Sequence, residues 1–551
     1  MQTYVDPRES RKERGAFFTP PSLARFIAEW AIRDAGDSVL EPSCGEAVFL
    51  TAAALRIAEL GGDPHAAQLM GVDLHEESVR RAADTLSSQG IEAGLTVSDF
   101  FDYREAAVNA VIGNPPYIRY HGFSGSARLK GTEAALAAGV RLTALASSWA
   151  AFTVVAATHL VAGGRLGLVL PAELLSVNYA AEVRSYLLRS FQRVRLVLFA
   201  TRVFPDVQEE VLLLLADGYQ PDGGGTDSFE VMQVESLADL ATSRAVSTWR
   251  PDQPGDKWTP ALAASPSYQE LVRSQAFGRL SGWGRLTLGA VTGANKYFAL
   301  SPQRADELGL TEGDLLPLSP PGSRHLRRLR LSAADLNELG DAGAQTLLFS
   351  PPGRPSPAAA TYIRAGELAG VSEAYKCRVR SPWWRVPRPP VADLLVTYMN
   401  ADSVALCANE ARAAHLNSVH GLVLAPETER IPPLLLALAA HNSATALGAE
   451  FTGRAYGGGL LKLEPREARD LPVPTLDAVR RAAGPLERAL PRVLELLERG
   501  EAEPARHVVD EALGLDVVVG ARGMEEIRQT RHYLAARRAA RGRGVDHAQQ
   551  P

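Results

Sequence analysis

The stretch Asn114-Pro115-Pro116-Tyr117 joins an amide, two prolines and an aromatic ring, just after the apolar run 108–112 and a glycine. Each proline fixes its own backbone and biases the residue before it toward an extended conformation. The four residues are therefore expected to form a rigid corner, called here the Asn114 corner. It would hold the side-chain oxygen of Asn114 and the backbone oxygen of Pro115 as neighbouring acceptors. Such a pair suits an amine with two N–H bonds, as in a nucleobase or an amide, and Tyr117 offers a ring for stacking on a flat substrate.

An amine of this kind is a poor nucleophile, because its lone pair is delocalised into the ring or carbonyl. Hydrogen bonds from both of its protons to the corner would shift the nitrogen toward a tetrahedral geometry with an exposed lone pair. The pattern therefore predicts transfer of an electrophilic group to a planar amine.

Acidic residues follow several apolar runs in the same part of the chain. Glu41 ends the first run, just before a turn in which Gly45 allows close backbone approach. Asp73 ends the next run, where a carboxylate can bind both hydroxyls of a ribose. Asp99 is a candidate acceptor for an exocyclic amine, with Phe100 beside it to flank a purine ring. Together these residues indicate a nucleoside-shaped pocket, although an acid at a strand end is also a common helix cap.

The glycine content of the first turn favours one nucleoside cofactor over others. A dinucleotide fingerprint needs G-x-G-x-x-G so that a pyrophosphate can approach the backbone, and PSCGEAVF contains one glycine. S-adenosyl-L-methionine has a nucleoside, no phosphate, and a reactive methyl group on a sulfonium. It is the predicted cofactor.

These residues need a scaffold that brings the ends of several strands together. Short apolar runs bounded by turn residues alternate with helical patterns over the first 245 or so residues, which predicts an α/β, doubly wound, mostly parallel sheet of the Rossmann type. Ligands of such sheets bind at the carboxyl ends of the strands. The predicted strands are 38–42, 69–74, 109–114, 165–171, 195–200 and 211–217.

Length and composition indicate a folded chain of two or three domains. The 551 residues are 46% hydrophobic and 22% charged, and the net charge of −5 leaves local basic clusters to be judged individually. Three separated cysteines favour a reducing compartment and exclude a cysteine metal cluster, and no metal site is predicted. With no apolar leader and no stretch long enough to span a bilayer, a cytoplasmic protein without membrane contact is expected.

Changes in composition and in hydrophobic spacing along the chain predict its division into domains. We expect a catalytic domain over 1–247 and a turn-rich linker up to residue 260. Residues 261–475 have short mixed segments and many prolines, which indicates an α+β module. Residues 476–551 regain helical spacing and end in a basic tail.

Seven segments, in their order along residues 11–217, resemble the γ-class, TaqI-like DNA adenine-N6 methyltransferases of restriction–modification systems. The resemblance implies a Rossmann-like methyltransferase domain that uses S-adenosyl-L-methionine. It further implies that Thr19 and Glu41 lie near the methionine end of the cofactor, that Asp73 holds the ribose and that Asp99 binds the adenine amine. The segments are GAFFTPPSLARFI, VLEPSCGEAVFL, GVDLHEES, SDFF, GNPPYIRY, GRLGLVLPAELL and RVFPDVQEEVLLLLA.

The same resemblance implies roles on the substrate side. Asn114 and Pro115 would bind the N6 amine of a flipped adenine in double-stranded DNA, and Tyr117 and Phe204 would sandwich the base. Phe204 could equally be a packing residue. The reaction would be in-line transfer of methyl from sulfonium to N6, with no covalent enzyme intermediate and no metal.

Two positions depart from the family pattern. Ala47 stands where a second glycine is common in the cofactor loop, which is expected to alter the loop's shape without removing a contact. The helix beginning LASSWAAF has Ser-Trp where family members often carry an acid or Asn followed by Leu-Tyr. No cofactor contact is assigned there.

The second half carries segments similar to the target-recognition domains of this class, VTGANKYFAL and EFTGRAYGGGLLKLEPREARDLPVP. Basic residues gather in two places, and each cluster is either a DNA contact or a solvated face. The same two interpretations apply to the basic helical tail, 524–543. The predicted DNA contacts are Arg324, Arg327, Arg328, Lys376, Arg378, Arg380, Trp383, Trp384 and Arg454.

Other functions share parts of this pattern. N-P-P-Y also occurs in enzymes that methylate glutamine side chains, and related motifs modify RNA bases; those enzymes generally lack a C-terminal module of this size. A catalytically silent DNA-specificity protein is the second alternative, and the intact N-P-P-Y and Asp73 argue against it. A fused nuclease is not expected, whereas a separate restriction endonuclease as partner stays open.

Overall fold

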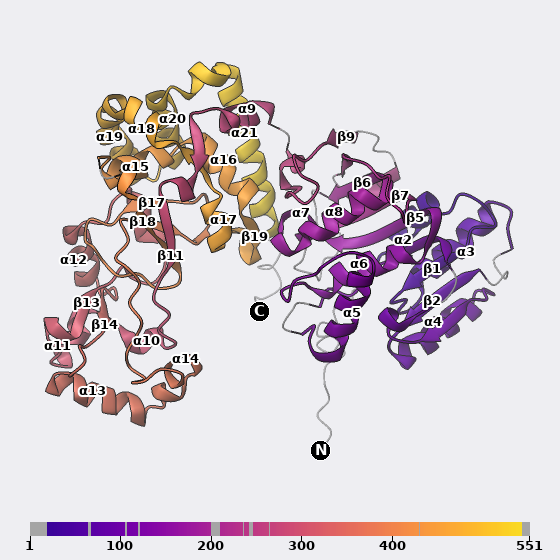
Figure 1. The fold of residues 1–551 in the computed structure, drawn as a ribbon, viewed down its shortest axis with the longest axis horizontal. Coiled ribbons are helices and arrows are strands. Elements are labelled where there is room, and N and C mark those ends of the chain that lie inside the picture. The colour runs from indigo at the N-terminus through magenta and orange to yellow at the C-terminus, as the bar shows by residue number, and fades with distance from the viewer. Residues whose placement is uncertain are drawn as a thin grey trace, which may run out of the picture. The chain divides into compact units, whose positions relative to one another are not determined.

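The computed structural model describes residues 19–63, 68–104, 107–118, 122–199, 210–234, 236–241, 246–263, 265–428 and 430–542. Phe204, the predicted second ring beside the base, lies outside these ranges. The chain divides into two compact units, Met1–Leu262 and Ala263–Pro551 (Figure 1). The expected linker 248–260 therefore belongs to the first unit, where Trp258 is fully buried and stacks on Phe229.

The first unit is built on a nine-stranded sheet with the order β3-β2-β1-β4-β5-β7-β6-β8-β9. All six predicted strands are present. Strands β1 to β5 pair in parallel, and β7 runs antiparallel to both of its neighbours, β5 and β6. The strands are β1 (Val39–Pro42), β2 (Leu69–Asp73), β3 (Gly94–Val97), β4 (Val108–Gly113), β5 (Leu160–Pro171), β6 (Phe191–Phe199), β7 (Val211–Tyr219), β8 (Phe229–Val234) and β9 (Val246–Trp249).

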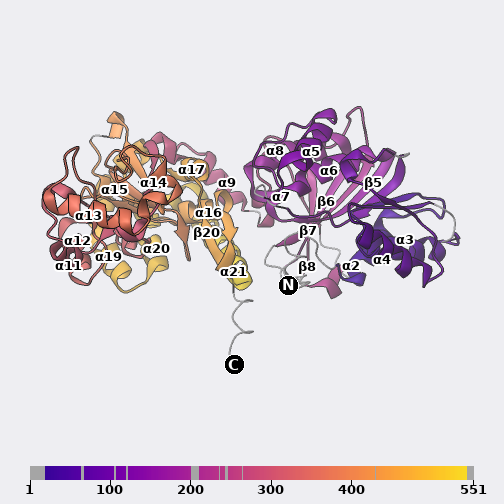
Figure 2. The same ribbon diagram turned by 90° about the horizontal axis from the view of Figure 1, so that it is seen from below.

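Helices cover both faces of this sheet, which confirms the doubly wound fold. Figure 2 shows α2 to α4 on one face and α5, α6 and α8 on the other. Ten of the eleven residues of α6 are buried, because this helix packs against β5 on one side and α5 on the other. The helices are α2 (Pro21–Ala31), α3 (Val48–Glu59), α4 (Glu76–Ser87), α5 (Gly125–Ala137), α6 (Ser148–Thr158), α7 (Glu173–Ser176) and α8 (Ala181–Ser190).

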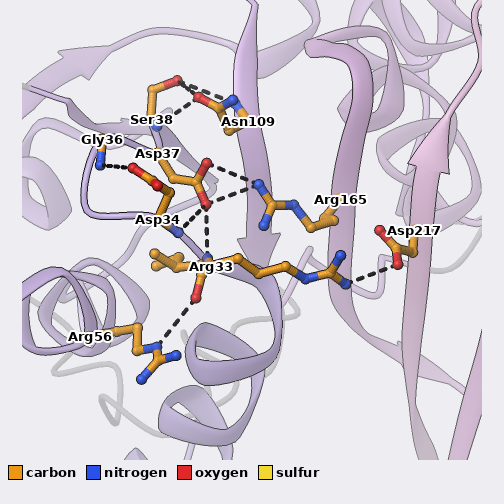
Figure 3. Close-up of polar contacts among 10 residues, drawn as sticks. Arg33, Asp34, Gly36, Asp37, Ser38, Arg56, Asn109, Arg165 and Asp217 are labelled. Atoms are coloured by element: carbon orange, nitrogen blue, oxygen red, sulfur yellow. Dashed lines mark hydrogen bonds and ion pairs between the residues drawn. The ribbon is translucent and has the colours of Figure 1, made fainter. Parts of the chain in front are cut away.

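A buried polar network joins several strands near one edge of the sheet (Figure 3). Arg165 of β5 forms an ion pair with Asp37 at 2.9 Å, with both side chains less than a tenth exposed. Next to it, the Asn109 side chain of β4 accepts hydrogen bonds from the backbone and hydroxyl of Ser38. A buried charge requires a partner, so this network fixes the first residues of β1 against β4 and β5. The carboxyl ends of the same strands lie at the opposite edge.

The second unit is α+β. A four-stranded antiparallel sheet has the order β11-β18-β15-β17, and three smaller sheets accompany it. Figure 1 shows α18 to α20 at one end of this unit and α11, α13 and α14 at the other. The strands are β10 (Phe277–Arg279), β11 (Gly284–Leu288), β12 (Ala299–Leu300), β13 (Leu315–Pro317), β14 (Leu347–Phe349), β15 (Leu394–Thr397), β16 (Met399–Asn400), β17 (Leu406–Ala408), β18 (Val419–Leu424), β19 (Arg454–Tyr456), β20 (Leu460–Lys462) and β21 (Pro472–Pro474).

The described part of the predicted helical segment, residues 476–542, shares a hydrophobic core with the rest of the second unit. Leu486 and Val493 lie in the same hydrophobic cluster as Leu280 and Trp283, because the helices pack on the sheet region of the unit. The helices are α9 (Pro266–Arg273), α10 (Asn295–Phe298), α11 (Pro302–Glu307), α12 (Ala333–Asp341), α13 (Pro357–Leu368), α14 (Tyr375–Arg378), α15 (Pro433–Ala440), α16 (Ser443–Thr452), α17 (Pro465–Arg469), α18 (Leu476–Arg481), α19 (Ala483–Glu498), α20 (Ala502–Leu513) and α21 (Leu515–Gly542).

The last helix, α21, turns several of its arginines into the unit. Arg531 and Arg538 are less than a tenth exposed and pair with Asp402 and Glu450. Arg528 pairs with Asp510, which is also buried. These three arginines of the basic helix therefore hold α21 in place and are not displayed for a phosphate.

Buried histidines should make the second unit sensitive to mild acid. Burial lowers the pKa of His415 to about 4, with the neighbouring His420 acting in the same direction. Since the ordinary histidine pKa is about 6.5, the unfolded chain takes up a proton first as the pH falls. The free energy of unfolding is therefore highest above about pH 6.5 and falls as the pH is lowered to about 4. The loss from this one residue is up to roughly 3 kcal/mol.

Urea unfolding at pH 7, 5.5 and 4.5 measures this effect. His415→Phe, which keeps a ring but cannot titrate, is expected to lose less stability between pH 7 and 4.5 than the native chain. His532→Gln, at an exposed position of the same unit, is the matched control. Equal losses in the native chain and His415→Phe would contradict the prediction.

Candidate functional site

The residues singled out in the sequence converge on the carboxyl edge of the parallel strands. Strand β1 lies between β2 and β4, with Pro42 opposite Val72 and Leu40 opposite Val111. Strand β4 in turn pairs with β5, with Gly113 opposite Leu168. The last residues of β1, β2 and β4 therefore lie along one edge, where open α/β sheets bind their ligands.

The Asn114 side chain is fixed at both ends of its amide. Its nitrogen donates to the Thr19 hydroxyl oxygen at 3.2 Å, and its oxygen accepts from the Tyr117 hydroxyl at 2.7 Å. Because the donor side is taken by Thr19, the amide oxygen is held on the side of Tyr117. An amide oxygen has two lone pairs, so one acceptor position is left for a substrate N–H.

Tyr117 is more enclosed than a free stacking platform would be. Its hydroxyl also lies 3.0 Å from the backbone oxygen of Val169 in β5, and the residue is 6% exposed. The hydroxyl therefore ties the corner to the neighbouring strand. Stacking of its ring on a substrate stays a prediction.

Glu41 caps the helix that follows the first turn. Its carboxylate accepts from the Leu50 amide at 3.0 Å, at the start of α3, and the residue is 2% exposed. Burial raises the pKa of Glu41 well above its usual range, opposed by hydrogen bonds from the Leu50 and Phe49 amides. The cap interpretation thus accounts for its position, and a contact with the methionine end of a cofactor stays a prediction.

Asp73 joins the end of β2 to the turn after β1. One carboxylate oxygen accepts from the Gly45 amide at 3.0 Å and the other from the His75 amide at 2.9 Å. Each oxygen keeps a further lone pair, as binding of ribose hydroxyls requires. Gly45 has a positive φ of 52°, and a side chain built on it would meet no protein atom within 4 Å. Open space beside Asp73 therefore fits a nucleoside ligand.

Asp99 and Phe100 lie at the next strand end but are partly engaged. Asp99 caps a short helical turn through the Phe101 amide at 3.1 Å, and Lys130 lies 3.5 Å from its other oxygen. Phe100 is 3% exposed, and its ring stacks on Phe152 with centroids 5.3 Å apart. The Asp99 side chain remains about a fifth exposed, as an adenine contact needs.

Sequence reasoning missed a second group of residues at this edge. Ser148, the first residue of α6, hydrogen-bonds the loop of the Asn114 corner. Beside it, Trp149 and Tyr179 converge on the Glu173 carboxylate. The sequence signal for this group is the Ser148-Trp149 pair in LASSWAAF, which departs from the family pattern and to which no function was assigned.

The predicted DNA contacts of the second unit separate into displayed and packed side chains. Arg324, Arg328, Lys376 and Arg378 are exposed and Arg327 is half-buried. Arg328 lies 3.4 Å from Asp335, and the half-buried Arg454 lies 2.6 Å from Glu467.

The two tryptophans are packed residues. Trp384 is 9% exposed within a hydrophobic cluster, and Trp383 packs against that cluster while its indole nitrogen donates to Glu367 at 3.0 Å. Arg380 is directed to backbone oxygens of the 291–292 segment. These three side chains are engaged within the unit, and a DNA contact by them stays a prediction. Tyr375 beside Lys376, by contrast, is 65% exposed.

A doubly wound sheet whose strands end in Asp73, Asp99 and the Asn114 corner defines an S-adenosyl-L-methionine-dependent methyltransferase. Within that class, the first unit matches the N-6 DNA methylases that its motifs resemble, and the chain is a DNA methyltransferase of the restriction–modification type. The N-6 DNA Methylase family model matches residues 3–225, and that of the C-terminal domain of the type II methyltransferase M.Eco57I matches residues 255–513.

Curated relatives align along most of their length. The type II methyltransferase M.AccI of Acinetobacter calcoaceticus is 24% identical over 83% of this chain and 85% of its own. The type II methyltransferase M.XamI of Xanthomonas campestris pv. amaranthicola is 25% identical over 86% of this chain and 87% of its own. Among solved structures, the type IIG restriction endonuclease BpuSI aligns at 14% identity over 98% of this chain and 67% of that chain, with a TM-score of 0.43.

The described residues contain no group of three or more His, Cys, Asp or Glu side chains arranged to hold a metal ion. Within the same ranges, no helix has the length and apolar character needed to cross a membrane.

The turn between β1 and α3 allows a test of cofactor binding. Gly45→Ala places a methyl group in the open space beside Asp73, and crowding of about 1–3 kcal/mol there corresponds to a rise of roughly fivefold to 150-fold in the Kd for S-adenosyl-L-methionine. Ala47 is the matched position, because it already has a positive φ of 62°. Ala47→Gly removes that strain and is expected to bind the cofactor within about twofold of the native chain.

Isothermal titration calorimetry measures both values, and thermal melting reports folding. If Gly45→Ala binds as tightly as Ala47→Gly, the open space beside Asp73 is not the cofactor site.

Proposed function

We propose that this protein methylates the N6 amine of a flipped adenine within a specific site in double-stranded DNA, as the modification enzyme of a type II restriction–modification system. The observation that carries the proposal is the Asn114 amide, held by Thr19 so that its oxygen faces Tyr117. S-adenosyl-L-methionine supplies the methyl group as an electrophile on sulfur. The chain's own residues must then hold and activate the amine.

On the substrate side, the Asn114 side-chain oxygen and the Pro115 backbone oxygen each accept a hydrogen bond from one N6 N–H. These two hydrogen bonds draw the nitrogen lone pair out of conjugation with the base, which stabilises the transition state more than the ground state. The ring of Tyr117 stacks on one face of the base, and Phe204 on the other. Stacking of about 1–3 kcal/mol per base offsets the few kcal/mol needed to extrude a nucleotide.

On the cofactor side, the residues are Thr19, Glu41, Gly45, Asp73, Asp99 and Phe100. Asp73 holds the ribose hydroxyls, Asp99 accepts from the adenine amine of the cofactor, and Phe100 lines its ring. Thr19 accepts from Asn114 through its oxygen and keeps its own proton to donate to the methionine carboxylate. This one hydroxyl would thereby connect the cofactor end of the site to the amine-binding end.

The second unit favours DNA over the alternative planar amines. A match to the C-terminal domain of a type II methyltransferase over 255–513 supports DNA as the substrate and argues against RNA bases and glutamine side chains. We propose DNA contacts at Arg324, Arg327, Arg328, Lys376, Arg378 and Arg454. Tyr375 joins them, because the Lys376 ammonium lies 5.5 Å from its exposed ring.

Charge reversal tests this surface. Lys376→Glu with Arg378→Glu should weaken DNA binding by at least about tenfold and lower the slope of log affinity against log salt by about two, since each lost phosphate contact removes about one. Arg492→Glu, at an exposed position of α19, is the matched control. An unchanged salt slope, measured by fluorescence anisotropy, would place the DNA elsewhere.

The modified base itself is identified by expression in a methylation-free host followed by long-read sequencing. We expect N6-methyladenine at one short sequence motif. A genome without modified adenine, from folded protein that binds the cofactor, would overturn the proposal. A separate restriction endonuclease would be recognised by its failure to cleave DNA that this protein has methylated at the mapped site.

A further inference from the structure

The loop of the Asn114 corner has few backbone groups with which to hold itself. Pro115 and Pro116 have no N–H, so the two residues that follow Asn114 cannot donate to a strand or helix. The carbonyl of Pro116 and the amide of Ile118 are both bound, and both bind the same residue of α6. The Ser148 hydroxyl donates to the Pro116 oxygen at 2.5 Å and accepts from the Ile118 amide at 2.9 Å.

Ser148 also uses its backbone for this contact. Its amide donates to the Ile118 oxygen at 3.0 Å, and its side chain is fully buried. Three hydrogen bonds thus join one residue to a loop about thirty positions earlier in the chain. Loss of the hydroxyl would leave the partly buried Ile118 amide and Pro116 carbonyl without this partner, which costs more than the bonds contribute.

The start of α6 is itself held to the end of β5. The Tyr179 hydroxyl lies 2.5 Å from the Glu173 carboxylate and 3.0 Å from the Ser147 hydroxyl. The Trp149 indole nitrogen lies 3.2 Å from the same Tyr179 oxygen. The first turn of α6 is therefore a fixed point between the ends of β4 and β5.

We propose that Ser148 is the positioning residue of this methyltransferase, acting through the loop to set where Asn114 and Pro115 present their oxygens. The inference rests on the proposed function, because those oxygens matter only if they bind the amine. Methyl transfer requires the amine within about 3–3.5 Å of the methyl carbon and in line with it, and a displacement of about 1 Å can lower the rate by about a hundredfold. A hydroxyl that ties the loop to a rigid helix limits that displacement.

The test compares hydroxyl removal at two positions of the same helix. Ser148→Ala removes the group that binds the loop, and Thr153→Val removes a buried hydroxyl that donates to the Trp149 carbonyl within α6. On DNA containing the mapped site, Ser148→Ala should lower kcat by at least about tenfold, while the KM for DNA and the Kd for S-adenosyl-L-methionine stay within about threefold. Thr153→Val should keep native kcat, and Ser148→Thr, which retains a hydroxyl, should restore most of it.

If Ser148→Ala does not fold, Ser148→Cys, with its weak donor, takes its place in the same assay. The inference is overturned if the variant lacking the hydroxyl matches Thr153→Val in kcat, or if kcat and cofactor affinity fall together. Failure of the proposed function gives a different result, because the native chain would then modify no adenine.

Discussion

Asn114→Ala is expected to lower the kcat for adenine methylation by at least about a hundredfold, since loss of one preorganised hydrogen-bonding group costs about 10²–10³ in rate. In the proposed mechanism, the side-chain oxygen is one of two acceptors that draw the lone pair of the amine out of the base. Truncation also leaves the Thr19 and Tyr117 hydroxyls without their Asn114 partner. Radiolabelled methyl transfer to DNA containing the mapped site measures the loss.

Binding separates this effect from misfolding. The Kd for S-adenosyl-L-methionine should change by less than about threefold, because Asn114 contacts the cofactor side only through Thr19. Asn178→Ala, at an exposed position of the same unit, is the matched control and should keep native kcat. An Asn114→Ala enzyme with more than a tenth of native kcat would mean that the corner does not bind the reacting amine.

Tyr117→Phe distinguishes the two contributions of its side chain. The ring remains for stacking, and the hydroxyl that reaches Asn114 and Val169 is lost. A partial fall in kcat with unchanged DNA affinity would assign the hydroxyl to holding Asn114. A fall in DNA affinity would instead require the hydroxyl to contact the substrate.

The parallel part of the sheet could be predicted because strands buried on both faces appear as continuous apolar runs. All six predicted ranges are strands. The reversal of β7 could not be predicted, since periodicity reports burial and carries no direction. Strand β3 was not predicted because none of its four residues is buried, so its sequence has no continuous apolar run.

The sequence was sufficient to predict which strand ends come together in the candidate site. Acids at those ends were visible, but the partner of each was not, because Glu41 and Asp99 bind amides whose positions depend on the following helix or turn. Ser148 could not be assigned because its partners precede it by some thirty residues. In the second unit, composition alone cannot separate a packed Trp384 from a displayed Tyr375.

The basic C-terminal helix shows the same difficulty with charge. Arginines of α21 that suggested a phosphate-binding face are paired inside the unit, and the most buried of the described pairs joins Arg538 to Glu450 of α16. The two groups make two contacts, at 2.8 and 3.1 Å, and both side chains are 4% exposed. Arg538 also donates to the backbone oxygens of Ala401 and Asp402. Its planar donor set thereby ties three segments of the unit together.

Glu450→Ala is therefore expected to destabilise the second unit by about 3–5 kcal/mol, because it leaves a buried guanidinium without its counter-charge. The backbone oxygens of Ala401 and Asp402 accept hydrogen bonds from Arg538, but they carry no full charge to replace the carboxylate. Hydrogen exchange measured by mass spectrometry should show faster opening of α16 and α21, and urea unfolding should show the loss of stability.

Glu495→Ala is the matched control, since Glu495 pairs with Arg492 and Arg499 on the exposed face of α19 and water can solvate both arginines. It should leave exchange in α16 and α21 unchanged. Equal effects of the two substitutions would mean that burial of the Arg538 pair does not matter. A large effect of Glu450→Ala with native DNA affinity in the surviving folded fraction would assign α21 to holding the second unit together rather than to contacting DNA.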